Sequence, residues 1–148
     1  MPDVKFRAVL PTNANASDQV TRLSISGSLP QDPQQFSVNF VNSIDCTDNI
    51  TYHFKVVIPT QTIIENYKRN GEWSSLHQEK YLNIFDETSF CLEFAFDYSN
   101  SMMRVYQGRD TGHNFITEYE TLFSLSDIQA VQVWGDVQKV NQFSLAYN

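Results

Sequence analysis

The chain has 148 residues, a formal net charge of −7, eleven Phe and seven Tyr. This length fits one domain, residues 1–148, with enough bulk to bury a core. The acidic charge opposes DNA and RNA as partners, because nucleic-acid affinity comes largely from lysines and arginines that neutralise phosphates. The aromatic content, together with frequent Val, Ile and Thr, favours β-strands over helices.

The N-terminal segment contains no positively charged start followed by a continuous apolar run, so we expect no secretory signal. No later segment is long and apolar enough to insert into a bilayer. We therefore expect synthesis in the cytosol. Cys46 and Cys91 lie in different predicted elements without metal-ligand spacing, which predicts free thiols.

Short runs of alternating apolar and polar residues recur between turn residues. They predict strands at Lys5–Leu10, Thr21–Gly27, Phe36–Asn42, Asn49–Ile58, Thr62–Lys68, Glu72–Ser75, Phe90–Tyr98, Met102–Gln107, Phe115–Glu118, Ile128–Gly135 and Gln138–Tyr147. About a dozen short strands at regular spacing indicate an all-β fold, an antiparallel two-sheet sandwich or jelly roll. Ser124 to Ile128 predicts one helical turn capped by Ser124 or Ser126, and Asn13 to Asp18 predicts an exposed loop.

Parity separates the two faces of the central strands. In 49–58 one face carries Tyr52, Phe54 and Val56, and the other carries Thr51, His53, Lys55 and Val57. In 36–42 the apolar set is Phe36, Val38 and Phe40, which leaves Ser37 and Asn39 on the opposite side. If these strands pair, one face is core and the other is a polar platform that could form a shallow binding groove.

Asn70 and Gly71 predict a two-residue hairpin turn, because both turn positions need positive φ. This turn fixes a register in which Arg69 faces Glu72, Lys68 faces Trp73 and Asn66 faces Ser75. An indole and an amide then lie on one face of the ribbon. An aromatic ring beside fixed polar groups is the chemistry that holds sugars.

Several short motifs together resemble the carbohydrate-recognition domain of galectins. They are Leu29–Pro30, Phe36–Phe40, His53–Phe54, Asn66 with Trp73 seven residues later, Phe90–Phe94 and Val133–Val137. The resemblance spans nearly the whole chain. It implies a concanavalin-like jelly-roll sandwich that binds β-galactosides, such as lactose-like disaccharides on glycoproteins and glycolipids, on one sheet face. It also implies no cofactor, no calcium and export from the cell without a signal peptide.

The galectin motif runs His-x-Asn-Pro-Arg, then Asn, then Trp-x-x-Glu-x-Arg, and this chain keeps part of it. His53, Asn66 and Trp73 match, whereas Lys55 and Val57 replace the Asn and Arg of the first group. After Trp73, the Glu and Arg positions hold Leu76 and Gln78, or His77 and Glu79 if one residue is inserted. The residues expected to bind carbohydrate are His53, Lys55, Asn66, Trp73, Gln78 and Glu79.

Each of these residues also has a purely structural interpretation. Trp73 could pack on the sheet surface, and His53 could be an ordinary surface histidine. Lys55 could be a solvated charge that donates but cannot accept. Glu79 could pair with a neighbouring lysine in a surface ion pair of small energy.

An enzymatic role is a weaker hypothesis. Glu93 and Asp97 share a predicted strand face, about 13 Å apart along an extended chain, whereas paired glycosidase carboxylates lie roughly 5 to 9.5 Å apart. Alternation of charged and apolar residues in 93–97, with the Phe side chains facing the core, explains both carboxylates as members of a solvated strand face. His53, His77 and His113 show no close metal spacing, and no Gly-x-Ser-x-Gly pattern occurs. We therefore expect no catalytic residue and no metal.

The primary hypothesis is a non-enzymatic, β-galactoside-binding lectin that acts outside the cell. The alternative is a galectin-fold protein with lost sugar specificity that works through protein contacts, and a third hypothesis is a preference for a different or modified glycan. We also expect a homo-oligomer, because weak sites gain avidity in assemblies and the first and last predicted strands are open edges.

Overall fold

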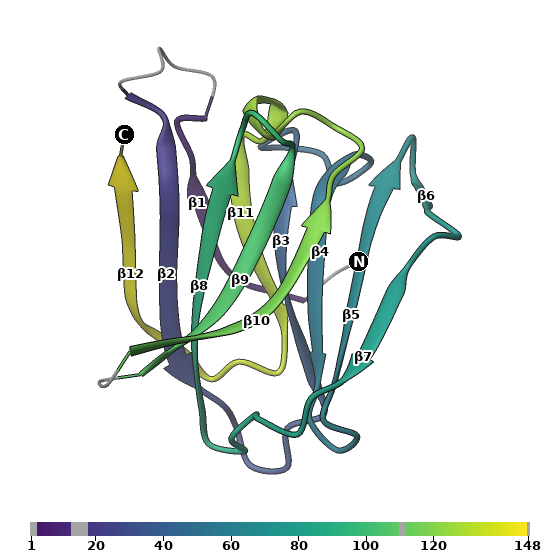
Figure 1. Cartoon of the computed structure of the whole chain (residues 1–148). Coiled ribbons are helices and arrows are strands. Elements are labelled where there is room, and N and C mark those ends of the chain that lie inside the picture. The colour runs from purple at the N-terminus through teal and green to yellow at the C-terminus, as the bar shows by residue number, and fades with distance from the viewer. Residues whose placement is uncertain (1–2, 13–17, 110–111, 148) are drawn as a thin grey trace.

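Two antiparallel sheets pack face to face in the computed structural model, which describes residues 3–12, 18–109 and 112–147 (Figure 1). In spatial order the seven-stranded sheet contains β1 (Val4–Val9), β11 (Ala130–Gly135), β3 (Gln35–Val41), β4 (Ile50–Val57), β5 (Thr62–Arg69) and β6 (Glu72–Trp73), and β7 (Gln78–Tyr81) also pairs with β5. The five-stranded sheet contains β10 (Gly112–Glu120), β9 (Met102–Arg109), β8 (Ser89–Asp97), β2 (Val20–Ser28) and β12 (Lys139–Tyr147). The predicted all-β two-sheet sandwich is confirmed.

The strands follow the predicted runs with small shifts at their ends, and one strand was not predicted. This strand, β7, has the sequence Gln-Glu-Lys-Tyr, which lacks apolar alternation. A 3₁₀ helix covers Leu125–Asp127, where Ser124 caps the turn by accepting a hydrogen bond from the Ser126 amide, as expected. Residues 13–17 of the expected Asn13 to Asp18 loop lie outside the described residues.

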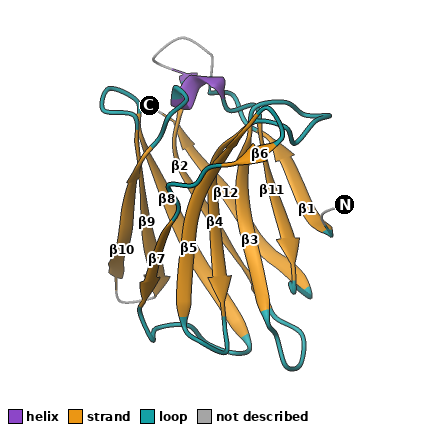
Figure 2. Ribbon diagram, turned by 90° about the vertical axis from the view of Figure 1, so that its right-hand side faces the viewer, coloured by secondary structure: helices purple, strands orange, loops and turns teal. Residues whose placement is uncertain are grey.

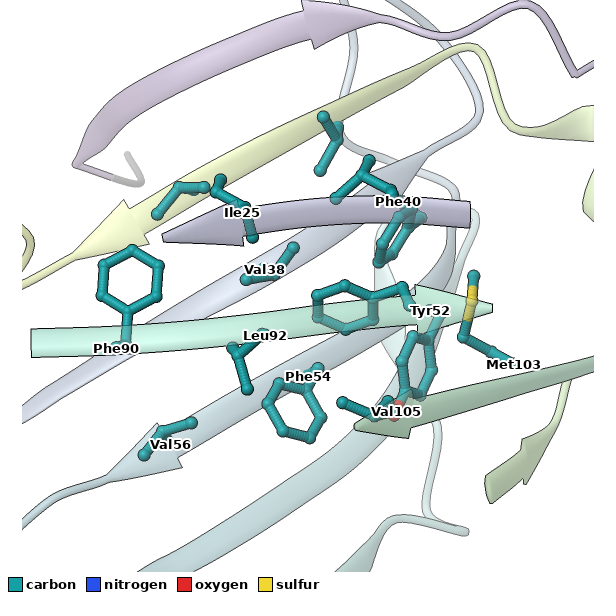
Figure 3. Packing of buried hydrophobic residues seen from close by; sticks show 14 of the residues in the cluster. Ile25, Val38, Phe40, Tyr52, Phe54, Val56, Phe90, Leu92, Met103 and Val105 are labelled. Atoms are coloured by element: carbon teal, nitrogen blue, oxygen red, sulfur yellow. The ribbon is translucent and has the colours of Figure 1, made fainter. Parts of the chain in front are cut away.

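Aromatic side chains from both sheets fill the space between them (Figure 3). Phe94 of β8 meets Phe40 and Phe54 edge to face, with ring centroids 5.0 Å and 5.6 Å apart. Full burial of each such ring stabilises the fold by about 1.5–3 kcal/mol. The residues predicted as the apolar faces of β3 and β4 are all in this core: Phe36, Val38, Phe40, Tyr52, Phe54 and Val56.

A buried polar cluster joins the two sheets near the edge formed by β5, β7 and β10. Its centre is the carboxylate of Glu65, which accepts hydrogen bonds from Tyr52 Oη (2.5 Å) and Thr117 Oγ1 (2.9 Å). Lys80 of β7 donates to the same Thr117 oxygen at 2.7 Å. Burial raises the pKa of Glu65, and the hydrogen bonds from Tyr52 and Thr117 partly offset that rise. We call these four residues the inter-sheet cluster.

At the opposite side of the sandwich, β1 and β12 are the edge strands of their sheets (Figure 2). Phe6 of β1 and Phe143 of β12 bridge these edges, with ring centroids 5.1 Å apart. Both cysteines are free, as predicted, and both are exposed. Within the described residues, no helix has the length and apolar character needed to cross a membrane.

Candidate functional site

The outer face of the seven-stranded sheet carries the polar side chains that parity predicted. On β4, Phe54 and Val56 point into the core, so His53 and Lys55 point away from it. The register pairs His53 with Asn39 of β3 and with Asn66 of β5, which places all three side chains on this face. We call it the groove face.

The β5–β6 hairpin forms as predicted and presents Trp73 on the groove face. Asn70 and Gly71 have φ values of 53° and 82°, as the two-residue turn requires. The ladder pairs Lys68 with Trp73 and Arg69 with Glu72, and the Trp73 side chain is 43% exposed. The Lys68 ammonium lies 5.2 Å from the centre of the indole, a cation–π contact that helps to hold the ring.

His53 lies at the centre of the groove face, between two tryptophans. Its ring centroid is 4.5 Å from that of Trp73 and 6.1 Å from that of Trp134. The residue is only 9% exposed. An imidazole in this position has its orientation set by neighbouring rings on both sides.

Asn39 fixes which nitrogen of His53 carries the proton. The Asn39 amide group donates to Ser37 Oγ (2.9 Å) and to the backbone carbonyl of Gln132 (3.2 Å), so its oxygen must be the atom that faces His53 Nδ1. An amide oxygen can only accept, so His53 Nδ1 is the donor. In the neutral ring Nε2 then has a free lone pair.

The neutral form of His53 dominates at every physiological pH. Burial, reinforced by the charges of Lys55 and Lys68, lowers the pKa of His53 from 6.5 to about 3. Among the described residues, no buried side-chain nitrogen or oxygen lacks a hydrogen-bond partner. Nε2 has no hydrogen-bond partner among these residues, so it cannot be fully buried, and we infer that it faces the groove that His53 lines and can accept from a ligand hydroxyl.

An open groove with a volume of about 390 Å³ lies beside His53, within the usual range of small-molecule sites. Its lining includes three of the six predicted site residues, His53, Lys55 and Trp73. The other lining residues are Asp3, Gln35, Phe36, Ser37, Trp134 and Gly135. The groove therefore extends from Trp73 across β4 and β3 to β11.

Trp134 was not predicted as a site residue, although the alternation of residues in its strand indicates that it lies on the groove face. In Ala130–Gly135, Val131 and Val133 are core residues, so alternation places Gln132 and Trp134 on the opposite face. A large aromatic residue on the polar face of a strand is a candidate for ligand contact.

The other three predicted residues do not line this groove. The Asn66 side chain holds the hairpin, because its amide donates to the Ser74 carbonyl (3.1 Å) and its oxygen accepts from the Tyr67 amide (2.8 Å). The expected pairing of Asn66 with Ser75 is absent, since β6 ends at Trp73.

The β7 register separates Gln78 from Glu79. Glu79 pairs with Ile64 and lies on the groove face, beyond β5, where it is exposed. Gln78 pairs with Glu65, so it points to the other side of the sheet. The carbohydrate-binding roles of Asn66, Gln78 and Glu79 stay predictions.

The carboxylates considered for catalysis each have an arginine partner on the outer face of the five-stranded sheet. Arg22 Nη1 contacts Glu93, and Arg104 Nη1 lies 2.9 Å from Asp97. Within the described residues, no group of three His, Cys, Asp or Glu side chains is arranged to hold a metal ion.

Another hollow, of about 480 Å³, lies among the loops at one end of the sandwich. It is lined by Leu29, Pro30, Gln31, Asp32, Pro33, Gln34, Ile58, Pro59, Glu87 and Thr88. This lining contains no aromatic ring and no cationic side chain. It lacks the stacking surface that the groove beside His53 provides.

The family model for the galactoside-binding lectins matches residues 5–145 of the chain. The chain belongs to the galectin family. Galectins are non-enzymatic lectins, which agrees with the expectation that this protein is not an enzyme. The proposed resemblance is therefore confirmed at the level of the family.

Solved galectin structures share the fold at low sequence identity. Sheep galectin-11, in a complex with glycerol, is 14% identical with a TM-score of 0.77, and the match covers 99% of each chain. The Caenorhabditis elegans galectin LEC-6 is 14% identical with a TM-score of 0.72, and the match covers 99% of this chain and 95% of that one. Comparison with curated proteins gives no significant match.

Proposed function

We propose that this galectin binds β-galactosides non-covalently in the groove beside His53. The observation that carries this proposal is the pairing of a half-exposed indole with a neutral imidazole whose acceptor nitrogen is open to the groove. The less polar face of galactose offers C–H groups to Trp73, while His53 Nε2 accepts from a ring hydroxyl. Lys55 lines the same groove and donates to another sugar oxygen.

Lactose affinity tests this proposal directly. Wild-type protein should be retained on immobilised lactose and eluted by free lactose. Trp73→Ala should weaken lactose binding at least tenfold, since the stacking surface is lost. Phe115→Ala is a matched control, because it removes an exposed ring from the five-stranded sheet. Equal retention of Trp73→Ala and the control would refute the assigned site.

The six predicted residues divide into three roles in this proposal. Trp73, His53 and Lys55 contact the sugar, and Asn66 positions the hairpin that carries Trp73. Glu79 and Gln78 do not line the groove, so, in contrast to the prediction from the sequence motif, Glu79→Ala and Gln78→Ala should change lactose affinity less than about twofold. Calorimetric titration with lactose measures the affinity of each folded variant. Lys55→Ala is the variant for comparison, because Lys55 lines the groove.

Protein recognition without galactose specificity is a second candidate, favoured by one observation. Without an insertion after Trp73, Leu76 occupies the position where the family motif has Glu, and this residue is 70% exposed. Leu76 and the exposed Trp73 line one small hollow, and contiguous exposed apolar side chains of this kind are typical of protein contacts. Absence of lactose retention and of any glycan-array signal, in a stably folded protein, would favour this candidate.

We further propose that the protein is a homo-oligomer that acts outside the cell. Support for assembly comes from the open edges of β1 and β12 and from the exposed side chains of Val9 and Tyr147 on them. Sedimentation equilibrium should give a mass of two or more times the 17.1 kDa of one chain. Val9→Lys should shift this mass toward that of the monomer. Immunodetection in the culture medium of intact producing cells tests export.

A further inference from the structure

We propose that Asn70 is a site of spontaneous covalent modification, and that its conversion to isoaspartate inactivates the groove. The reaction is deamidation through a cyclic imide, with the backbone nitrogen of Gly71 as the nucleophile. Asn70 and Gly71 form the only Asn-Gly pair in the sequence. The modification needs no ligand, whereas its effect on sugar binding rests on the proposed function.

The reaction needs no enzyme and consumes only water. The Gly71 nitrogen loses its proton to solvent base and attacks the side-chain carbonyl carbon of Asn70. A carbon–nitrogen bond forms, and the side-chain nitrogen of Asn70 leaves as ammonia. Water then opens the five-membered imide at either carbonyl, which gives aspartate or isoaspartate at position 70. The two groups are neighbours in one chain, and a glycine nitrogen has no Cβ beside it to hinder the attack.

The structure leaves the side chain of Asn70 available for this attack. Asn70 and Gly71 are both exposed, at the end of the sandwich where β5 joins β6 (Figure 1). Among the described residues, the side-chain amide of Asn70 has no hydrogen-bond partner. The turn is held to the neighbouring loop through its backbone. The Asn70 N–H donates to Asn49 Oδ1 and the Gly71 N–H donates to the Asp48 carbonyl, both at 2.9 Å.

The bond from Gly71 to Asp48 controls the rate, because it occupies the attacking nitrogen. The nitrogen is released when the turn opens locally. Such an opening breaks few contacts compared with unfolding of the whole domain, so it occurs far more often. We therefore expect the modification to proceed in the folded protein.

Two other asparagines, Asn42 and Asn100, are each followed by a serine and provide an internal comparison. Asn42 Oδ1 accepts a hydrogen bond from Thr51 at 2.6 Å, and Asn100 Nδ2 donates to Asp97 at 2.9 Å. Both side chains are held by these bonds, and the serine side chain hinders the following nitrogen. We expect both asparagines to react more slowly than Asn70.

The two products differ in their effect on the hairpin. In isoaspartate the backbone runs through the former side chain, which adds one methylene group to a loop whose length fixes the pairing of β5 with β6. Trp73 pairs with Lys68 two residues after Gly71, so its indole should leave its place 4.5 Å from the His53 ring. Aspartate keeps the backbone unchanged, and Asp-Gly is itself a favoured pair for this turn.

Ageing of the purified protein in mildly alkaline buffer made with heavy-oxygen water tests the inference. Peptide mapping by mass spectrometry follows the labelled product at each asparagine, and an isoaspartate-specific methyltransferase measures isoaspartate. Conversion at Asn70 should be about tenfold or more faster than at Asn42 or Asn100. Retention on immobilised lactose should fall in proportion to isoaspartate at position 70. Circular dichroism verifies that the aged protein stays folded.

Two variants separate the covalent step from other effects of ageing. Asn70→Gly cannot form the imide and accepts the φ of 53° at this position, so its lactose retention should not fall relative to its own fresh sample. Fresh Asn70→Asp, which carries the new charge without the longer backbone, should bind lactose within about twofold of fresh wild type.

Fluorescence gives a readout that does not depend on sugar. In Trp134→Phe, Trp73 is the only tryptophan, and its emission should shift as isoaspartate accumulates. The same ageing of Trp134→Phe combined with Asn70→Gly should leave the emission unchanged.

The outcomes separate the inference from the proposed function. Conversion at Asn70 that is no faster than at Asn42 and Asn100 overturns the modification site. Full lactose retention or unchanged Trp73 emission in protein that contains isoaspartate overturns its effect on the groove. Failure of fresh wild-type protein to bind lactose overturns the proposed function, whereas the mass and emission measurements still decide whether Asn70 reacts and moves Trp73.

Discussion

Two buried polar clusters lie on opposite faces of the same sheet and differ in one respect. In the inter-sheet cluster, both oxygens of Glu65 accept hydrogen bonds from protein groups, and Lys80 also donates inward. In the groove cluster of Asn39, Ser37, Gln132 and His53, the hydrogen bonds also join protein groups, but His53 Nε2 accepts none from the described residues. A closed network stabilises the fold, whereas a network with one open acceptor can also bind a ligand.

The largest expected effect on stability comes from breaking the inter-sheet cluster. Glu65→Ala would leave the Tyr52 hydroxyl and Thr117 without their buried acceptor, which should lower the free energy of unfolding by about 3 kcal/mol. Urea denaturation monitored by circular dichroism measures this loss. The folded fraction should still bind lactose normally, because Glu65 faces away from the groove. Loss of less than about 1 kcal/mol would contradict the role assigned to the cluster.

Breaking the groove cluster should affect both the stability of the fold and the binding of lactose. Asn39→Ala removes the acceptor of His53 Nδ1–H, at a cost of about 2 kcal/mol in unfolding free energy. The proton is then no longer confined to Nδ1, so lactose affinity should fall about tenfold. Thr51→Ala, which removes a hydrogen bond to Asn42 outside the groove lining, serves as the control for a general loss of stability. If Asn39→Ala binds lactose as tightly as wild type, the tautomer argument is wrong.

The lowered pKa of His53 predicts a specific pH dependence of stability. The unfolded chain takes up a proton on this side chain near pH 6.5, whereas the folded protein does so only near pH 3. Unfolding therefore becomes easier as pH falls through that window, by up to about 1.4 kcal/mol per pH unit from this residue. The difference in unfolding free energy between wild type and His53→Gln, measured from pH 7 to pH 3.5, should show this slope.

Sugar binding should be insensitive to pH over the same upper range. Since His53 stays neutral, lactose affinity at pH 5 should equal that at pH 7 within about twofold. A fall in affinity centred near pH 6.5 would show that the imidazole titrates normally in the groove.

The smallest expected effect on stability comes from Lys80, at the edge of the inter-sheet cluster. Lys80→Met removes a half-exposed ammonium that donates to Thr117, and it should cost less than about 1 kcal/mol in unfolding free energy. A matched denaturation series with Glu65→Ala provides the measurement. A cost equal to that of Glu65→Ala would show that the lysine is an essential member of the cluster.

Local patterns in the sequence predicted the parts of this molecule that depend on local rules. Alternation placed Tyr52 in the core and His53 on the groove face, and Asn70 and Gly71 fixed the register of Trp73. By contrast, β7 is a polar edge strand stabilised by pairing with β5, and its residues show no apolar alternation from which a strand could be predicted. Propensity cannot detect a strand whose main stabilisation is a partner distant in sequence.

The site was predicted only in part, because its other half comes from distant segments. Trp134 meets His53 through the order of strands β11, β3 and β4, which no short pattern encodes. Asn66 was expected to face the ligand, but the end of β6 at Trp73 leaves a carbonyl that its amide satisfies. Lys55 lines the groove as expected, since parity alone decides the face of a regular strand.

The two-residue turn at Asn70 and Gly71 limits how this protein can evolve. Successive side chains of a strand alternate between faces, so inserting or deleting one residue in the turn would replace Trp73 on the groove face by a neighbour. The hairpin can therefore tolerate exchange of its amino acids over generations, but not a change in its length.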